Sequence, residues 1–280
     1  MIDAATHNEL LTALQWYVDH GVTDVLLNDA IDRTIVIEPA ILPSVISSHV
    51  MDAAQKAKVA MDAHIFLGKS DAYDEAVRLA KSVDTLGDLQ KIIAKFDGVA
   101  LKKTATNMVF AGGNSNAKIM LIGDAPMAED DRLGQVFSGV EGQLLDKMLG
   151  CIGLGRNYKD MDRAVYMSNM LNWRPPGNRS PSLAEIEVSL PFIEKHIQLA
   201  KPKILIFCGS ATAKALLGRS ESISRLRKSW HDYMPQTSEL CTKDSVSIPA
   251  IVIHSMPALI KTPSQKKAAW ADMLMLQEKL

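Results

Sequence analysis

The sequence has 280 residues, nearly half of them apolar, and a formal net charge of −1. A chain of this length can bury one sizeable core plus an appendage, and its balanced charge excludes a uniformly basic coat, though not a local basic patch. The three cysteines are far apart and form no CxxC pair, which argues against a disulfide framework and a zinc ribbon. Because neither a signal-peptide pattern nor a membrane-spanning apolar run is found, a cytoplasmic protein is expected.

The first 84 residues are expected to form a helical extension and a linker. Residues 6–20 have the spacing of an amphipathic helix, residues 22–50 are mixed and favour a loop, and residues 51–69 are Ala-rich and compatible with a helix. A clearer helix is predicted to begin near Thr85, where TLGD resembles a capping box. The main domain is therefore expected to cover residues 85–280.

Beyond residue 105, short apolar runs alternate with helical patterns. Strands are predicted over residues 118–122, 164–169, 203–208 and 249–253, and helices over residues 142–150, 182–201, 210–218 and 264–279. Ser182 and Glu185 resemble a second capping box at the start of the second of these helices. This alternation predicts a mostly parallel central sheet covered on both faces, that is, a three-layer α/β/α sandwich with an N-terminal helical extension. Ligands bind such sheets outside the carboxyl ends of the strands, and polar or small residues stand there: Asp124, Asn169, Gly209, His254 and Ser255.

Four segments, in this order, resemble family 4 of the uracil-DNA glycosylase superfamily. They are GDAPMAEDDRLGQVFSGVEGQLLDKML, SNMLNWRPPGNRSP, ISRLRKSWHDY and PALIKTPSQKKAAWADML, and the similarity extends over residues 96–280. The N-terminal QWYVDHGV is also similar to the extension of alphaproteobacterial members. The resemblance implies a monofunctional hydrolase that cleaves the N-glycosidic bond of deoxyuridine in DNA, releases uracil and leaves an abasic site.

The resemblance also assigns roles in the base pocket. Asp124, which stands where the family has Glu, would position water or stabilise the cationic sugar; Phe137 would stack on uracil. Asn169 would read the uracil edge, since its amide offers both a donor and an acceptor, and Gly123 lies beside these groups. Each has a plainer alternative: a turn Asp, a core Phe and a strand-end Asn bonded to the backbone.

Three further places are candidates for DNA contacts. The loop RPPGNR supplies Arg174 and Arg179, whose guanidinium groups can reach phosphates, and it is stiffened by Pro175 and Pro176. Gly209 and Ser210 open a helix whose free amides can take a phosphate, although a simple tight turn explains them equally well. Lys261 matches a family Arg expected near DNA, and a solvated lysine is an equally good account.

The last motif departs from the family pattern HPxYLLR. It has the sequence HSMPALIK, so that Ser255 falls at the position of the family His and His254 lies one residue before it. Because neighbouring residues of an extended segment point in opposite directions, either a register shift brings His254 into the site or Ser255 replaces the imidazole. Met127 in place of Gly and Val136 in place of Pro are further departures that can alter the pocket.

Many family members hold an iron–sulfur cluster on four cysteines. The equivalent positions in this chain are Phe96, Val99, Trp173 and Ser189, none of which supplies a thiolate. We therefore expect no iron–sulfur cluster, no metal and no other cofactor.

Other functions are compatible with parts of this pattern. A DNA-binding homologue with weakened catalysis fits the changes at Asp124, Met127 and the last motif, and a glycosylase for another deaminated base, such as hypoxanthine or xanthine, fits an altered pocket. A nucleoside hydrolase or transferase on a similar sheet would leave RPPGNR unexplained. The expected partner is uracil-containing DNA, bound by a monomer.

Overall fold

The computed structural model describes residues 70–241 and 246–280. These residues belong to one compact unit, in which helix α3 (Asp71–Lys81) packs against helix α7 (Leu183–Ala200). The expected domain boundary at residue 85 falls inside this unit, because the apolar face of α3 is buried in its core. The predictions for residues 6–20, 22–50 and 51–69 lie outside the described residues.

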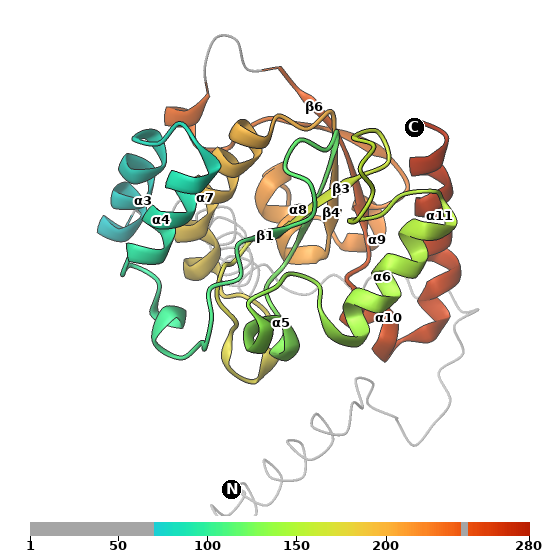
Figure 1. The fold of residues 1–280 in the computed structure, drawn as a ribbon, viewed down its shortest axis with the longest axis horizontal. Helices are drawn as coiled ribbons and strands as arrows, with labels where there is room; N and C mark the ends of the chain where they lie inside the picture. Colours follow the sequence, from blue (N-terminus) through green and yellow to red (C-terminus); the bar gives the residue numbers. More distant parts are fainter. Residues whose placement is uncertain (1–69, 242–245) are drawn as a thin grey trace, which may run out of the picture. The chain divides into compact units, whose positions relative to one another are not determined.

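The unit is organised around a six-stranded sheet with the order β1-β3-β2-β4-β6-β5 (Figure 1). The strands are β1 (Ala111–Gly112), β2 (Ile119–Gly123), β3 (Val165–Asn169), β4 (Ile204–Cys208), β5 (Trp230–Tyr233) and β6 (Ile248–Ile253). The four central strands are parallel and match the four predicted ones, whereas β1 and β5 pair antiparallel at the two edges. The prediction of a mostly parallel sheet is confirmed, and the two short edge strands were missed.

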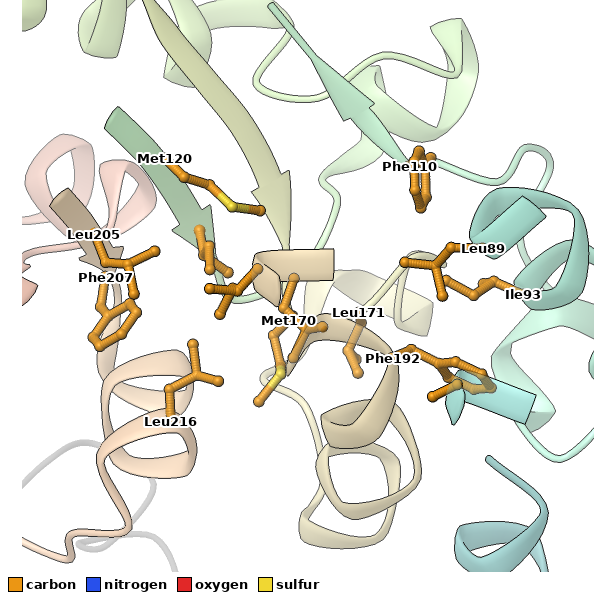
Figure 2. Packing of buried hydrophobic residues seen from close by; sticks show 14 of the residues in the cluster. Leu89, Ile93, Phe110, Met120, Met170, Leu171, Phe192, Leu205, Phe207 and Leu216 are labelled. Atoms are coloured by element: carbon orange, nitrogen blue, oxygen red, sulfur yellow. The ribbon is translucent and has the colours of Figure 1, made fainter. Parts of the chain in front are cut away.

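One face of the sheet is covered by α3, α4 (Leu86–Lys95), α7 and α8 (Ser210–Leu217) (Figures 1 and 2). Alternate strand residues point to this face, among them Met120, Leu205 and Phe207, and they belong to one buried cluster with Leu89, Ile93 and Leu216 of the helices. Because every residue of β2 and β3 is buried, both faces of these strands need apolar side chains.

The opposite face is covered by α6 (Gly139–Cys151), α10 (Met256–Lys261) and α11 (Lys266–Gln277) (Figure 1). The strand residues between those of the first face, such as Leu121 and Ile206, pack there with Leu145 and Met273. The three-layer α/β/α sandwich is therefore confirmed. In the part of the chain that the structure describes, no helix is long and apolar enough to cross a membrane.

Helix starts follow the predicted capping residues. Thr85 caps α4 by accepting a hydrogen bond from the amide of Asp88 at 3.1 Å, and Ser182 and Glu185 form a reciprocal capping box at the start of α7. The remaining helical elements are short: α5 (Ala128–Leu133), α9 (Ile223–Leu226), and the 3₁₀ turns Ala100–Lys103, Pro176–Asn178, Ser238–Leu240 and Pro263–Gln265. Several of these short elements surround the carboxyl ends of the central strands.

Candidate active site

A pocket of about 140 Å³ lies at the carboxyl ends of β2, β3 and β4. The parallel register aligns Gly123 at the end of β2 with Asn169 on β3 and Cys208 on β4, and all three line the pocket. This is the place where open parallel sheets bind ligands. Its volume is smaller than the roughly 300–1,000 Å³ of sites for drug-sized molecules and suits a single small ring.

Gly123 lines the pocket next to two predicted site residues, and it has no side chain that would displace them. A Cβ atom on Gly123 would lie 2.5 Å from Oδ1 of Asn169 and 2.7 Å from Cζ of Phe137. Any side chain at position 123 would therefore push the amide or the ring away. The structure thus brings Gly123, Phe137 and Asn169 together, as the sequence predicted.

Phe137 belongs to the turn between α5 and α6, and its backbone has a φ of +48°. This left-handed conformation is uncommon for a residue with a large side chain. The ring is partly exposed and lines the pocket, so Phe137 is not an ordinary core residue. A flat aromatic face on the wall of a small pocket is suited to stacking on a planar base.

Asn169 is only 2% exposed, and its Nδ2 has no hydrogen-bond partner among the described residues. An unsatisfied buried amide donor costs about 1–3 kcal/mol, so this group is unfavourable in the fold unless a ligand accepts from it. The plainer alternative, in which the side chain bonds to the local backbone, does not describe this nitrogen. Its place on the pocket wall directs the donor to a bound molecule.

Asp124 follows β2 and lies against the start of α8. Its Oδ1 accepts a hydrogen bond from the amide of Thr212 at 2.8 Å, and a Cβ on Gly209 would lie 2.3 Å from its Oδ2. Burial raises the pKa of the Asp124 carboxyl, and hydrogen bonds from Thr212 and Ala211 oppose that rise. Asp124 also lines the pocket, so a buried carboxylate with an elevated pKa is available there.

The contact between Asp124 and α8 bears on the predicted role of Gly209 and Ser210. The amide of Thr212, in the first turn of α8, already serves the Asp124 carboxylate. Gly209 has a φ of +130° and leaves room for that carboxylate. The first turn of α8 therefore already bonds the Asp124 carboxyl, and a phosphate contact by Gly209 and Ser210 stays a prediction.

The last motif places Ser255 in the pocket and His254 outside it. Nε2 of His254, which is 5% exposed, lies 2.6 Å from Nη1 of Arg227. Arg227 also donates to Asp272 Oδ2 and to the carbonyl of Ala268, both at 2.5 Å. Ser255 lines the pocket at the start of α10. The interpretation in which His254 enters the site is corrected, because this imidazole is held in a buried network beneath α11.

The environment of His254 also determines its charge. Burial lowers the pKa of His254, and the neighbouring Arg227 guanidinium lowers it further. A neutral imidazole accepts a hydrogen bond from Arg227, whereas a protonated one would place two cations in contact. His254 is therefore a neutral structural acceptor.

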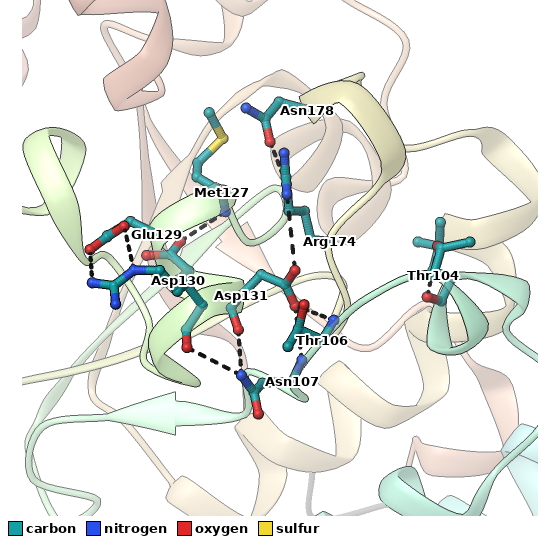
Figure 3. Close-up of polar contacts among 11 residues, drawn as sticks. Thr104, Thr106, Asn107, Met127, Glu129, Asp130, Asp131, Arg174 and Asn178 are labelled. Atoms are coloured by element: carbon teal, nitrogen blue, oxygen red, sulfur yellow. Dashed lines mark hydrogen bonds and ion pairs between the residues drawn. The ribbon is translucent and has the colours of Figure 1, made fainter.

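The loop after β3 forms part of the pocket wall, through Asn178 and Arg179 among others. Arg174 donates from Nε to Oδ1 of Asn178 at 2.7 Å, and its Nη1 lies 4.0 Å from Oδ2 of Asp131 (Figure 3). Asp131 in turn accepts from the amides of Thr106 and Asn107 at 2.8 and 2.9 Å (Figure 3). Arg174 thus links the loop to α5 and to the segment before β1.

Arg179 is also engaged within the chain. Its guanidinium pairs with both carboxylate oxygens of Glu185, at 2.9 and 2.5 Å, and donates to the carbonyl of Ser180. Pro175 is buried and Pro176 is exposed in the same loop. Since both arginines have acidic or amide partners, the loop is preorganised, and its contact with phosphates stays a prediction.

Three other positions noted in the sequence, Lys261, Met127 and Val136, differ in exposure and in whether they line the pocket. Lys261 is exposed at the end of α10, outside the pocket lining. Met127 lines the pocket at the start of α5, and Val136 is buried, 1% exposed, beside the turn that carries Phe137. Of these two departures from the family pattern, only Met127 lines the pocket.

The four positions equivalent to cluster cysteines are all buried. Phe96, Val99 and Trp173 are members of the core cluster, and Phe96 makes an edge-to-face contact with Phe192 at 5.1 Å. Ser189 is 6% exposed. Apolar side chains and one hydroxyl do not fit an iron–sulfur cluster, which needs thiolate ligands. Within residues 70–241 and 246–280, no group of three or more His, Cys, Asp or Glu side chains is arranged to hold a metal ion.

Sequence reasoning missed two acidic residues of the pocket. Asp130 is 3% exposed and accepts hydrogen bonds from the amides of Met127 and Ser138 at 2.9 and 2.5 Å. Glu141, in the first turn of α6, lines the same pocket. Asp130 bonds back to the N-cap amide of Met127, which is half of a capping box, but Met127 has no side-chain oxygen, so the residue types carry no capping signal for Asp130. Nothing in the sequence alone distinguishes Glu141 from a solvated helix residue.

Comparison with known proteins places this geometry in context. The sequence model of a family described as "Uracil DNA glycosylase superfamily" matches residues 110–274. A type-4 uracil-DNA glycosylase from Pyrobaculum aerophilum is 36% identical over 133 residues, or 46% of this chain and 65% of that protein. Proteins of the same name from Archaeoglobus fulgidus and Saccharolobus solfataricus are each 33% identical, over 47% and 54% of this chain and 63% and 69% of their own lengths. The chain thus spans slightly less than two thirds of the first two relatives.

Proposed function

The chain belongs to the uracil-DNA glycosylase superfamily, and from this premise we propose that it removes uracil from DNA. The reaction is hydrolysis of the bond between C1′ of deoxyribose and N1 of uracil. The electron pair of that bond leaves with the base, water adds to C1′, and an abasic site remains. A base in a duplex must first be extruded from the helix to reach a pocket of this kind.

The observation that carries the proposal is the unpaired donor of Asn169. Its Nδ2 is buried on the pocket wall without a partner among the described residues. Uracil presents a carbonyl oxygen, O4, beside an N3–H donor, and a side-chain amide complements both. Binding uracil would satisfy Nδ2 and hence remove the cost of its burial.

The remaining base contacts come from Phe137 and Gly123. The Phe137 ring stacks on the planar base, and Gly123 lets the ring and the Asn169 amide approach from neighbouring positions. Met127 adds bulk to the same wall and limits the size of the base that enters. A pocket of about 140 Å³ favours a single pyrimidine ring over a purine.

Asp124 acts on the sugar and on water in this proposal. The sugar becomes oxocarbenium-like as the bond breaks, and a nearby carboxylate stabilises that charge or accepts the proton of the attacking water. The amides at the start of α8 hold one carboxylate oxygen in place, through Thr212. Burial raises the pKa of Asp124 and so makes its carboxylate a stronger proton acceptor than an exposed one.

Ser255 is the group that meets the departing base at the position where the family has His. A serine hydroxyl donates a hydrogen bond to a developing oxyanion but carries no charge. We expect a weaker stabilisation of the leaving anion than an imidazole provides. Catalysis therefore depends more heavily on Asn169 and Asp124.

DNA outside the flipped base is held by the pocket rim. Arg174, Pro175, Pro176 and Arg179 form a preorganised loop there, and Lys261 is exposed at the end of α10. Gly209 and Ser210 remain candidates for a phosphate contact. We further propose that the protein works as a monomer in the cytoplasm and that it holds no metal and no iron–sulfur cluster, which the apolar environment at Phe96, Val99 and Trp173 supports.

Excision from a labelled oligonucleotide with one deoxyuridine tests the proposal, with the wild type, Asp124→Ala and His254→Ala compared side by side. We expect cleavage by the wild type, its collapse in Asp124→Ala and its retention in His254→Ala. Matched oligonucleotides with hypoxanthine or xanthine identify a glycosylase for another base. Retained DNA binding with no excision from any of these substrates would contradict the proposed activity.

A further inference from the structure

The turn that carries Phe137 has a backbone conformation that its own residues do not favour. Phe137 has a φ of +48°, and a left-handed conformation at a bulky residue persists only where the surroundings impose it. The turn joins α5 to α6 over residues 134–138. Other parts of the chain must therefore hold it.

Arg156 lies after α6 and reaches back to this turn. Its Nη1 donates to the carbonyl of Val136 and its Nη2 to the carbonyl of Phe137, each at 2.9 Å. Its Nε donates to Oδ1 of Asp146 on α6, also at 2.9 Å. The planar guanidinium thus binds two consecutive carbonyls of the turn while a carboxylate fixes its own orientation.

Two further contacts, from α5 and from α6, hold the turn. The amide of Ser138 donates to Oδ1 of the buried Asp130 at 2.5 Å. A Cβ atom on Gly142 would lie 1.6 Å from the carbonyl oxygen of Phe137, so that oxygen is pressed against the first turn of α6. The position of the Phe137 ring is therefore set by these backbone contacts, since the ring itself faces the pocket.

We propose that Arg156, oriented by Asp146, is a positioning residue that holds the Phe137 ring at the stacking position for the extruded base. The inference rests on the proposed function, in which Phe137 stacks on uracil. Arg156 touches backbone carbonyls and does not line the pocket, so it acts through Phe137. A lysine cannot replace it fully, because one ammonium group cannot donate to two carbonyls and a carboxylate in the same plane.

A double-mutant cycle separates this role from general stabilisation. We would measure single-turnover excision and the affinity for free uracil in the wild type, Arg156→Gln, Phe137→Ala and the double variant. If Arg156 acts through Phe137, Arg156→Gln lowers excision by roughly 10–100-fold in the wild type but has little effect once the ring is absent. Arg156→Lys should be intermediate, and affinity for undamaged DNA should stay within about twofold, as for a group outside the DNA contacts.

Arg163 provides a matched control. Its Nε donates to the carbonyl of Gly153 at 3.0 Å and its guanidinium stacks on Tyr158, so it is another arginine bonded to a carbonyl near the end of α6. Arg163→Gln should leave excision and free-uracil affinity unchanged. If the wild type excises uracil and the losses of excision in Arg156→Gln and Phe137→Ala are additive in the double variant, the positioning role is overturned.

Amide hydrogen exchange keeps the test independent of activity. Arg156→Gln should speed exchange at Ser138 and Gly142, whose amides are bonded within the turn, and leave Leu121 and Ile206 in the central strands unchanged. If exchange is faster in Arg156→Gln but the wild-type protein excises no uracil, Arg156 still positions the turn and the proposed function is rejected. Unchanged exchange at Ser138 and Gly142 would overturn the positioning role itself.

Discussion

Two walls of the same pocket differ in how they use their polar groups. On the β2–β3 wall, Asn169 presents an unpaired donor and Phe137 presents a ring, and nothing else in the described chain occupies either group. On the β6 wall, the imidazole of His254 is bonded to Arg227 and only Ser255 faces the pocket. The first wall therefore leaves its polar donor free for a ligand, whereas the imidazole next to the second wall is used in the fold.

In the proposed function, base recognition and leaving-group stabilisation rest on separate segments of one site. The base would be read at the ends of β2 and β3, where the register fixes Gly123 beside Asn169. The departing anion would be stabilised by the segment after β6, where one residue of register decides which side chain faces inward. The buried Arg227–Asp272 pair stabilises the register with His254 outside, because Arg227 needs that acceptor.

The largest effect is expected from Asp124→Asn, which keeps the oxygen that accepts from Thr212 and removes the charge. Excision should fall by roughly 10²–10³-fold, the usual loss for a group aimed at transition-state charge. The wild-type rate should rise with pH through a pKa above the ordinary Asp value of about 3.9, because burial raises the pKa of Asp124. A pH–rate profile of both proteins checks this, and an unchanged acid limb in Asp124→Asn would assign it to another group.

The pH dependence of the free energy of unfolding tests the raised pKa of Asp124 independently of activity. Because its folded pKa is raised, its favourable contribution is fully present below the unfolded pKa and is lost as pH rises through the folded pKa. Asp124→Asn should therefore raise the free energy of unfolding at pH 7 and change it little near pH 3. Denaturant unfolding at the two pH values measures the difference, and destabilisation at pH 7 would show that the carboxylate is well compensated in the fold.

Asn169→Ala removes the unpaired amide donor of the β2–β3 wall. Loss of one hydrogen bond to a buried base should lower excision by roughly 10–100-fold. The free energy of unfolding should change little through hydrogen bonding, because Nδ2 has no partner to lose among the described residues. Excision assays and denaturant unfolding test both statements.

Asn172→Ala is the matched control for Asn169→Ala. Asn172 is also buried, but its Nδ2 donates to the carbonyl of Val109 at 3.1 Å. Its removal should cost about 1–3 kcal/mol of stability and leave excision by the folded protein nearly unchanged. If Asn169→Ala weakened uracil excision and general DNA binding equally, its role as a base reader would be contradicted.

On the β6 wall, one variant adds an imidazole to the pocket and another removes the imidazole that lies outside it. Ser255→His places an imidazole in the pocket and should raise excision by roughly tenfold, less than the roughly 10²–10³-fold that one preorganised donor contributes, because the serine hydroxyl already donates there. His254→Ala should leave excision within a few fold but destabilise the protein by about 1–3 kcal/mol, because buried Arg227 loses an acceptor. Collapse of excision in His254→Ala at unchanged stability would reverse the assignment of the two residues.

The smallest effect is expected from Arg179→Gln on the rim. Since Arg179 is already paired with Glu185, its loss should weaken DNA binding by less than about fivefold. Lys261→Gln is the comparison, because an exposed lysine on a phosphate should lower the salt dependence of binding by about one unit of slope. Binding titrations at several salt concentrations distinguish them, and equal slopes for both variants would remove Lys261 from the DNA contacts.

The sequence by itself determined the central architecture. The four apolar runs became the parallel strands β2, β3, β4 and β6, because strands buried on both faces need continuous apolar residues. The capping residues Thr85 and Ser182 marked two helix starts, since their side chains bond locally. The strand pattern placed Asp124 and Asn169 at the carboxyl ends of β2 and β3, whereas Phe137, in the turn between α5 and α6, was indicated only by the family resemblance.

Tertiary structure decided what depends on contacts between distant residues. Strand β5 pairs antiparallel with β6 across a connection that the sequence does not predict. Helix α3 belongs to the core because its buried face, Tyr73, Ala76, Val77 and Ala80, packs against distant residues, although the sequence prediction began the main domain only at residue 85. The register at His254 and Ser255 was ambiguous in the sequence, because one residue reverses a side chain and the choice rests on Arg227, 27 residues away in the chain. The hydrogen bonds from Arg156 to the carbonyls of Val136 and Phe137 could not be predicted from the sequence either, because every residue has a backbone carbonyl.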